Sequence, residues 1–513
     1  MKIALVETKP SRTNFVREFD GAFEFDRYQL CSDPTIKKVL KRDCDIEIDT
    51  SLYDWIILVG SDALKYFTKI NSVTEYSGRK VDDKFLPVIN PAMLSFKPEA
   101  RRTWEDSKKR IIEYINGLIE DVIIDDKIAR GIQDTEEAKK WIQEALDDKG
   151  DKVSLDSETS GLYPRNGHVL GLSMCYDGKH GVYIDAECLD EEAEEMLQLL
   201  FKEKIVLFHN AKFDMAFFEY HFNFEFPRFE DTMLLHYLID ENPGHHGLKE
   251  LSLKYTVYGD YEKPLYEWMD KYKRENGLNN ASFRWDMIPF DQMYTYAAMD
   301  AVCTYILFEK FVKIKKNPNL KKVYDNILIP GSRFLTDLQD NGVPFDANRL
   351  AVSQALMQED IDEAVAGLQK FPEIAKFEEY QEKDFNPNST VQLRSLLFDF
   401  VGMKPTGKKT GTGAHSTDAE VLQQLAEQHE IPKYILDLRQ KSKIKNTYLD
   451  KIIIQLDMDG RLRTGFNLHS TTSGRLSSSG KLNMQQLPRD NPIVKGCIKA
   501  SEGHKIVAMD LTT

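Results

Sequence analysis

Three short motifs in the middle of the chain contain side chains that can hold a metal ion. Asp156 and Glu158 lie two residues apart in VSLDSETSGLYP, a pattern that predicts a strand followed by a Gly/Pro turn. Alternate side chains of a strand lie on the same face, so both carboxylates can converge on one cation. An Asp-x-Glu pair on a strand is more often simply solvated, so this spacing alone carries little weight.

The second motif is LFHNAKFDMAFF, where an apolar strand is predicted to run directly into a helix. Asn210 and Asp214 then lie four residues apart on one helical face. Asn210 can also serve as a plain N-cap. Asp214 is flanked by Phe213 and Met215, and an unpaired carboxylate on such an apolar helix should find a partner or a metal ion.

The third motif is YTYAAMDAVCTY, which predicts a helix with Tyr296 and Asp300 four residues apart. A buried tyrosine with a single hydrogen bond is the ordinary explanation of such a pair. Chance is a poor account of all three motifs together, since they follow one another on a strand, at a strand-to-helix junction and on a helix.

In this order the motifs resemble those of the DEDD exonuclease superfamily, in the subclass with tyrosine in the third motif. The resemblance implies a ribonuclease-H-like domain with four carboxylates that hold two divalent ions: Asp156, Glu158, Asp214 and Asp300. It also implies that Tyr296 orients the attacking water and that Asn210 contacts DNA. Oxygen ligands suit Mg²⁺, with Mn²⁺ as the alternative. One ion would activate water and the other would stabilise the leaving 3′ oxygen, so the expected reaction releases nucleoside monophosphates from a 3′ end.

Two features near these motifs are expected to have structural and not catalytic roles. Asp231, in FEDTMLLHYL, is expected to cap or position the helix that follows and is left out of the catalytic set. His245 and His246, in PGHHGLKEL, are expected to belong to a helix-entry loop, because they have no cysteine partners for a zinc site.

The second half of the chain resembles the family A DNA polymerases, the class of bacterial DNA polymerase I. Four segments appear in the order of that family: FNPNSTVQLRSLLFD, RQKSKIKNTYLDK, TTSGRLSSSGKLNMQQLPR and KIVAMDLTT. The resemblance implies minor-groove and primer contacts by Arg475, Asn483 and Gln485. It implies backbone contacts on the thumb by Lys441, Lys443 and Lys445. One cation and two amides can read acceptors that all correct base pairs share, and lysines add salt-dependent affinity.

Asp510, in VAMDLTT, matches the first metal-binding aspartate of the polymerase palm, and HKIVAMDLTT predicts a buried strand. The fingers helix and the second palm aspartate have no counterpart in the 513 residues. We therefore expect an incomplete polymerase site. A second polypeptide could supply the fingers and the rest of the palm, and a truncation explains the end equally well.

The expected architecture is multidomain, with α/β and α+β parts. Residues 1–126 predict an α/β domain, because two apolar runs precede turns and SDALKYF has helical spacing. Residues 127–318 form the exonuclease domain, and 319–513 form a helical thumb with the beginning of the palm. Within the family, the chain resembles the T-five-type bacteriophage polymerases through the KIALVE start, ILVG followed by SDALKYF, INPAMLSFKPE and the DLTT wording. This resemblance implies a uracil-glycosylase-like first domain, in which we identify no glycosylase chemistry.

Composition sets the remaining limits. Hydrophobic residues make up 42% of the chain, enough for globular cores, and no apolar run approaches the roughly 20 residues of a membrane span. Six scattered cysteines without a CxxC pair favour a reducing cytoplasm, that of the host cell if a phage encodes the protein. The net charge of −15 opposes nucleic-acid binding unless basic residues gather locally.

Two alternatives stay open beside a polymerase with an exonuclease domain. A standalone 3′–5′ exonuclease of the ribonuclease D type, acting on RNA, would share the acidic motifs, although the GRLSS segment argues against it. A non-catalytic DNA-binding subunit would carry a vestigial acidic site, although all four carboxylates and the tyrosine are present. In each case the expected partners are nucleic acids: primer–template DNA and single-stranded 3′ ends for the favoured interpretation.

Overall fold

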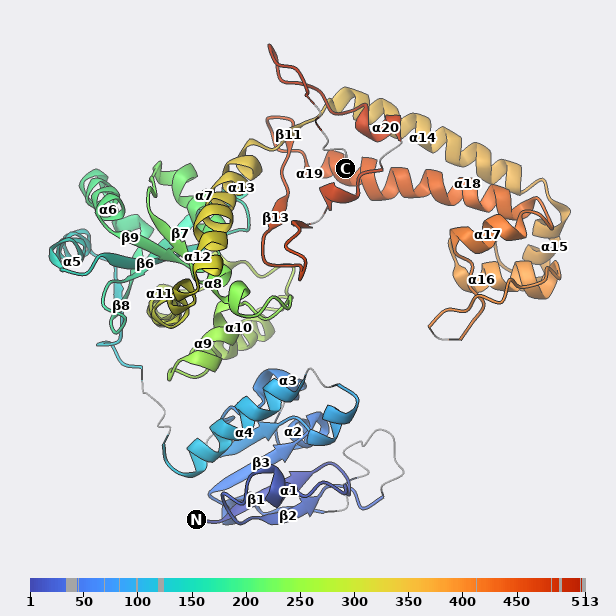
Figure 1. The fold of residues 1–513 in the computed structure, drawn as a ribbon. Coiled ribbons are helices and arrows are strands. Elements are labelled where there is room, and N and C mark those ends of the chain that lie inside the picture. Colours follow the sequence, from blue (N-terminus) through green and yellow to red (C-terminus); the bar gives the residue numbers. More distant parts are fainter. Residues whose placement is uncertain are drawn as a thin grey trace. The chain divides into compact units, whose positions relative to one another are not determined.

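The computed structural model describes residues 1–33, 44, 46–68, 70–82, 84–97, 100–118, 124–411, 413–480, 482–488, 491–507 and 509. The chain divides into two compact units, Met1–Ile329 and Pro330–Thr513 (Figure 1). The architecture mixes α/β and α+β parts, as predicted. The domain boundaries after residues 126 and 318 stay predictions.

The first part of unit 1 is a parallel α/β sheet with the strand order β2-β1-β3-β4. Both predicted apolar runs form its central strands, and SDALKYF forms α2, so these expectations are confirmed. The elements are β1 (Ile3–Glu7), α1 (Phe15–Glu18), β2 (Asp26–Gln29), β3 (Trp55–Val59), α2 (Ser61–Phe67), α3 (Val73–Tyr76), β4 (Phe85–Val88) and α4 (Arg101–Ile115).

The second part of unit 1 contains a mixed six-stranded sheet with the order β10-β9-β6-β7-β8-β5. Strand β6 pairs antiparallel with β7 and parallel with β9. The strands are β5 (Ala129–Ile132), β6 (Lys152–Thr159), β7 (Val169–Cys175), β8 (Gly181–Asp185), β9 (Ile205–Phe208) and β10 (Phe229–Asp231). The strands expected around the acidic motifs are therefore confirmed.

Helices cover both faces of this sheet, which positions the acidic motifs. Helix α11 packs against β5, β6, β7 and β8, whereas α7 contacts β6, β7 and β9. Because side chains alternate along β6, Val153 and Leu155 join the apolar core on one face while Asp156 and Glu158 lie on the other. The helices are α5 (Thr135–Asp147), α6 (Glu191–Glu203), α7 (Ala211–Phe222), α8 (Thr232–Ile239), α9 (Leu248–Tyr255), α10 (Lys263–Glu275) and α11 (Phe290–Phe311).

Unit 2 is mainly helical. Two long helices, α14 and α18, pack along each other, and Figure 1 shows the shorter α15, α16 and α17 at one end of the pair. In α18 the buried Ile431, Ile435 and Leu438 follow the i, i+4, i+7 spacing of one apolar face. The helices are α12 (Pro318–Val323), α13 (Ile329–Asn341), α14 (Ala347–Leu368), α15 (Pro372–Gln381), α16 (Thr390–Arg394), α17 (Ala419–Leu425), α18 (Ile431–Lys443), α19 (Asp450–Gln455) and α20 (Pro492–Lys495). Helix α12 precedes the unit boundary, and α13 crosses it.

Short strands flank the long helices: β11 (Val343–Pro344), before α14, pairs with β12 (Arg461–Leu462), and β13 (Gly465–Asn467) pairs with β14 (Ser477–Ser479) after α19. The buried strand predicted for HKIVAMDLTT is wrong for the part that the structure describes. Ile506 is 61% exposed and Val507 is 76% exposed. A strand becomes buried only through neighbours, and no described strand pairs with this segment.

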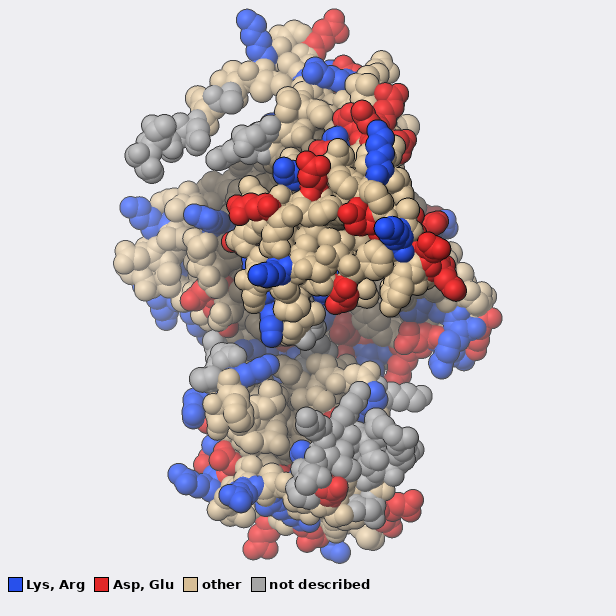
Figure 2. Space-filling view, turned by 90° about the vertical axis from the view of Figure 1, so that its right-hand side faces the viewer, with Lys and Arg blue, Asp and Glu red and all other residues tan. Residues whose placement is uncertain are grey.

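Charge is mixed on the surface. On the face shown in Figure 2, Lys and Arg side chains alternate with Asp and Glu side chains. No helix in the described ranges is both long and apolar enough to cross a membrane.

Candidate active site

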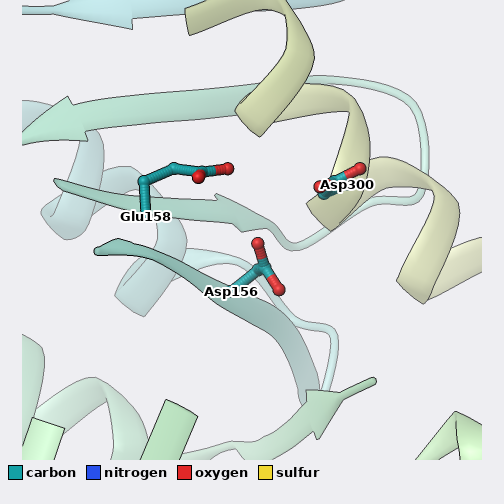
Figure 3. Close-up of side chains that lie close together, drawn as sticks. All are labelled: Asp156, Glu158 and Asp300. Atoms are coloured by element: carbon teal, nitrogen blue, oxygen red, sulfur yellow. The ribbon is translucent and has the colours of Figure 1, made fainter. Parts of the chain in front are cut away.

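Three carboxylates meet at the face of the sheet that α11 covers. Asp156 and Glu158 come from β6 and Asp300 comes from α11, and one oxygen of each lies within 4.8 Å of the others (Figure 3). Glu158 and Asp300 are only 5% and 4% exposed. The expectation that the first and third motifs converge is therefore confirmed by the geometry, although their separation in sequence is large.

We call Asp156, Glu158 and Asp300 the acidic cluster. Its environment favours the protonated forms of Asp156 and Glu158. Burial and then repulsion from Asp214, Asp300 and Glu158 raise the pKa of Asp156 well above its usual range. Burial and the charge of Asp300 raise the pKa of Glu158 to about 8. The charge of Lys249 acts in the opposite direction and lowers both pKa values, but it does not outweigh burial and repulsion.

Asp214 lies outside the group of three and is bound to the strand that carries two of them. Its Oδ1 accepts the backbone N–H of Ser157 at 3.0 Å and the Ser157 hydroxyl at 2.7 Å. Burial raises the pKa of Asp214 to about 7 in spite of these hydrogen bonds, which lower it. The partner expected for this carboxylate is thus a serine between Asp156 and Glu158, and the Asp214 charge still acts on Asp156.

Asn210 occupies the N-cap position of α7, but its side chain makes no capping hydrogen bond. Its backbone is left-handed, with φ of 71°, a conformation that asparagine tolerates better than most residues. The carboxylate of Asp231 performs the capping instead, since it accepts the backbone N–H groups of Asn210 at 3.2 Å and Ala211 at 2.9 Å. The Asn210 side chain keeps its amide group for another partner.

Asp231 is also the N-cap of α8, as predicted, and accepts the backbone N–H groups of Met233 and Leu234 at 2.9 and 3.3 Å. One buried carboxylate therefore joins the beginnings of two helices. The hydroxyl of Tyr324 accepts the backbone N–H of Asp231 at 2.8 Å and holds this point from a third segment.

Tyr296 lies beside the cluster and is 9% exposed. Burial and the charges of Asp300 and Glu158 raise the pKa of its phenol well above the usual range, so it stays protonated and able to donate a hydrogen bond. Trp285 approaches from the segment before α11 and donates its indole N–H to Glu158 Oε2 at 2.6 Å. Sequence reasoning missed Trp285, because nothing local links it to a glutamate 127 residues away.

Lys249 is a second residue that the motifs did not reveal. Its ammonium contacts Asp300 Oδ1, which also accepts a hydrogen bond from the Tyr261 hydroxyl. It lies 3.8 Å from the ring centroid of Tyr296 and 4.7 Å from that of Tyr261. The only available signal was a lysine in GLKELSLKY, a segment considered for its histidines.

Those histidines lie in the loop that leads into α9, as predicted. His245 pairs with Glu250 at 3.0 Å, and His246 is buried, with its Nδ1 2.9 Å from that of His236.

The donor set fits divalent cations that prefer oxygen. Asp156, Glu158 and Asp300 offer carboxylate oxygens alone, with no imidazole or thiolate in the group, and such ligands suit Mg²⁺ or Mn²⁺ better than softer metals. Burial and repulsion between carboxylates raise the pKa values of Asp156 and Glu158, and a bound cation would favour their ionised forms.

The predicted thumb lysines in unit 2 differ in their environment. Lys441 pairs with Asp437 at 2.8 Å and Lys445 pairs with Asp450 at 3.0 Å. Lys443, at the end of α18, is exposed and has no ion pair with any described residue. Lys443 is therefore the most available of the three cations.

The other predicted DNA contacts lie in the strands and loops that follow. Arg475 is exposed, Asn483 caps a short helical turn by accepting the backbone N–H of Gln485 at 3.0 Å, and Gln485 donates its side-chain N–H to the Leu476 carbonyl at 3.1 Å. Asp510, predicted as a palm metal ligand, lies outside the described residues.

The family described as 3′-5′ exonuclease matches residues 129–315, and the family described as DNA polymerase family A matches residues 355–513. A DNA polymerase of Escherichia phage T5 is 41% identical over 537 residues, which cover 100% of this chain and 62% of that relative. A DNA polymerase of Bacillus phage SP01 is 25% identical over 519 residues, which cover 86% of this chain and 55% of that relative. The chain thus spans less than two thirds of either relative.

A solved structure described as the POL domain of Pol1 from M. smegmatis, in complex with DNA primer-template and dNTP, has a TM-score of 0.56. It is 22% identical and the match covers 73% of this chain and 59% of that chain, so this likeness concerns the fold alone. A standalone ribonuclease D-type exonuclease does not account for the polymerase match. The chain is a member of an enzyme family: it belongs to the family A DNA polymerases and carries their 3′–5′ exonuclease domain.

Proposed function

We propose that this chain removes nucleotides from DNA 3′ ends by two-metal hydrolysis and so proofreads DNA synthesis. The single observation that carries the proposal is the meeting of Asp156, Glu158 and Asp300, whose oxygens lie within 4.8 Å of one another. We include Asp214 among the metal ligands because the resemblance of the second motif implies it, although it lies outside the group of three.

Bound Mg²⁺ or Mn²⁺ would supply a water nucleophile at neutral pH and neutralise charge on the leaving 3′ oxygen. The protein's own groups then position the reactants. The protonated phenol of Tyr296 orients the attacking water by a hydrogen bond. Trp285 fixes the Glu158 carboxylate, and Asn210 offers its side-chain amide to the DNA strand, since Asp231 already caps the helix.

We further propose that unit 2 binds primer–template DNA. The exposed Lys443 is available for the phosphate backbone, and Lys441 and Lys445 would exchange their aspartate partners for phosphates. Arg475, Asn483 and Gln485 would contact the primer terminus and the minor groove. The neighbouring solved structure was determined in complex with a DNA primer-template, which is consistent with DNA binding by a unit of this fold.

The proposed division of labour follows the predicted domains. Residues 127–318 carry the exonuclease, residues 319–513 belong to the thumb and palm, and the activity of residues 1–126 is left unassigned. We place the protein in the cytoplasm, that of the host cell if a phage encodes it.

The test uses a 5′-labelled primer–template with a 3′ mismatch, incubated with and without Mg²⁺. We expect stepwise shortening that requires the metal and that is lost in Asp156→Ala/Glu158→Ala. A matched control is Asp134→Ala/Glu136→Ala, which removes two carboxylates at the beginning of α5.

An RNA primer of the same sequence, run in parallel, distinguishes a deoxyribonuclease from a ribonuclease. Wild-type protein that leaves the DNA primer intact in Mg²⁺ and in Mn²⁺ would overturn the proposal and favour a DNA-binding subunit with a vestigial acidic site.

A further inference from the structure

Lys249 lies on the acidic cluster without belonging to any of its motifs. Its ammonium contacts Asp300 Oδ1, and its side chain is 23% exposed while that of Asp300 is 6% exposed. The rings of Tyr296 and Tyr261 flank the ammonium, with centroids at 3.8 and 4.7 Å. Aromatic faces attract a cation, so these rings help to hold Lys249 at the carboxylate.

Lys249 and Tyr261 together occupy the acceptor sites of one Asp300 oxygen. A carboxylate oxygen offers about two lone-pair sites. Asp300 Oδ1 accepts from both the Lys249 ammonium and the Tyr261 hydroxyl, so both sites are in use. A metal cation at the cluster must therefore bind Asp300 through Oδ2, or displace Lys249 or the Tyr261 hydroxyl from Oδ1.

In either case the lysine charge opposes the cation. A positive charge in contact with a metal ligand repels a divalent ion at short range, in a site that is largely shielded from water. The lysine charge also stabilises the site, because Lys249 is the cation that contacts Asp300 among the described residues.

We propose that Lys249 is a resident counter-charge of the exonuclease site, which holds Asp300 in place when metal is absent and weakens metal binding when it is present. Lys249 is a positioning residue, because it acts through Asp300 and Tyr296. The inference rests on the proposed metal-dependent function and adds a determinant of metal affinity from outside the acidic motifs.

Two consequences distinguish this role from simple packing. Lys249→Met keeps the length of the side chain and removes its charge, so we expect the site to bind Mn²⁺ about tenfold more tightly, as loss of a close repulsive charge predicts. We also expect the variant to unfold at a lower temperature than wild type in chelator and to recover this loss in Mn²⁺, because binding to the folded state stabilises it.

The experiment titrates the full chain with Mn²⁺ and follows free Mn²⁺ by electron paramagnetic resonance. Asp156→Ala/Glu158→Ala identifies the component that belongs to this site. Lys249→Arg keeps the charge and should match wild type. Lys254→Met removes another lysine of α9, one whose ammonium lies over the ring of Tyr255. This variant should also bind Mn²⁺ as tightly as wild type. Lys249→Gln serves as a second neutral variant if Lys249→Met does not fold.

Tighter Mn²⁺ binding by the neutral variants, together with a larger thermal shift between chelator and Mn²⁺, would support the inference. Equal or weaker binding by the neutral variants overturns it while leaving the proposed function intact. Wild-type protein that shows no Mn²⁺ component sensitive to Asp156→Ala/Glu158→Ala overturns the proposed function and this inference with it.

Discussion

Asp214 Oδ1 accepts both the backbone N–H and the hydroxyl of Ser157, at 3.0 and 2.7 Å. Ser157 lies between the two carboxylates of the first motif, with its side chain on the opposite face of β6. The second motif is therefore fastened to the first by Ser157, a residue of the first motif that is not one of its acidic groups. The contact holds α7 against β6 beside Asp156 and Glu158.

Ser157→Ala removes the shorter of these two bonds and leaves a buried carboxylate with one donor fewer. We expect the free energy of unfolding to fall by about 1–3 kcal/mol, the usual cost of a lost hydrogen bond to a buried charged group. Exonuclease turnover should fall on the order of tenfold as Asp156 and Glu158 lose their alignment. Urea unfolding and single-turnover primer shortening measure the two effects.

The matched control is Ser282→Ala, since that hydroxyl is exposed and bonds within its own turn. It should change stability by less than about 0.5 kcal/mol. Equal losses of stability in Ser157→Ala and Ser282→Ala would contradict the role proposed for Ser157.

Asp231→Asn tests whether the Asp231 carboxylate stabilises the beginnings of both α7 and α8. The carboxylate accepts four backbone N–H groups through two oxygens, and an amide keeps only one of those oxygens. We expect a loss of about 1–2 kcal/mol in the free energy of unfolding. Exonuclease activity should fall as well, because α7 carries Asn210 and Asp214.

Asp134→Asn is the comparison, because Asp134 caps α5 with a single hydrogen bond to Glu137 at 2.9 Å. Asparagine caps about as well as aspartate there, so thermal unfolding should be nearly unchanged. Equal losses of stability in Asp231→Asn and Asp134→Asn would show that capping a second helix adds nothing to the contribution of Asp231.

The pKa of Glu158 predicts how the metal-free protein responds to pH. It lies at about 8 in the folded protein, above the ordinary value of 4.5. The folded state thus holds this proton more tightly than the unfolded state. Its contribution to stability is complete below about pH 4.5 and is lost as the pH rises through about 8.

We therefore expect the advantage of Glu158→Gln over wild type, measured by thermal unfolding in chelator, to grow between about pH 5 and pH 8. Mg²⁺ should stabilise wild type more at the upper end of this range than at the lower end, because the cation favours ionised carboxylates. Parallel curves for the two proteins across the range would contradict the raised pKa.

Lys443→Ala tests DNA binding by unit 2. Lys443 has no ion pair among the described residues, whereas Lys441 pairs with Asp437 at 2.8 Å. We expect Lys443→Ala to weaken primer–template binding and to lower the slope of log affinity against log salt by about 1. Lys441→Ala should do less, since Asp437 already neutralises the Lys441 charge in the folded protein. Fluorescence anisotropy at several salt concentrations measures both, and a greater effect of Lys441→Ala would reverse this ranking.

The sequence by itself determined the types of the elements around the acidic motifs and the family of the chain. Strand alternation put Asp156 and Glu158 on one face, and helical spacing put Tyr296 beside Asp300, because both patterns depend only on neighbours along the chain. Asp231 was also predicted correctly as a helix cap, since capping residues lie next to the helix they cap.

Tertiary structure alone decided what surrounds those carboxylates. Trp285 bonds to Glu158 across 127 residues, Asp214 to Ser157 across 57 and Lys249 to Asp300 across 51. The periodicity of the sequence does not predict contacts between residues so far apart, because these contacts form only when the folded sheet and its helices bring the segments together. For the same reason the predicted strand near Val507 was wrong: an apolar run becomes a buried strand only where other strands are present to pair with it.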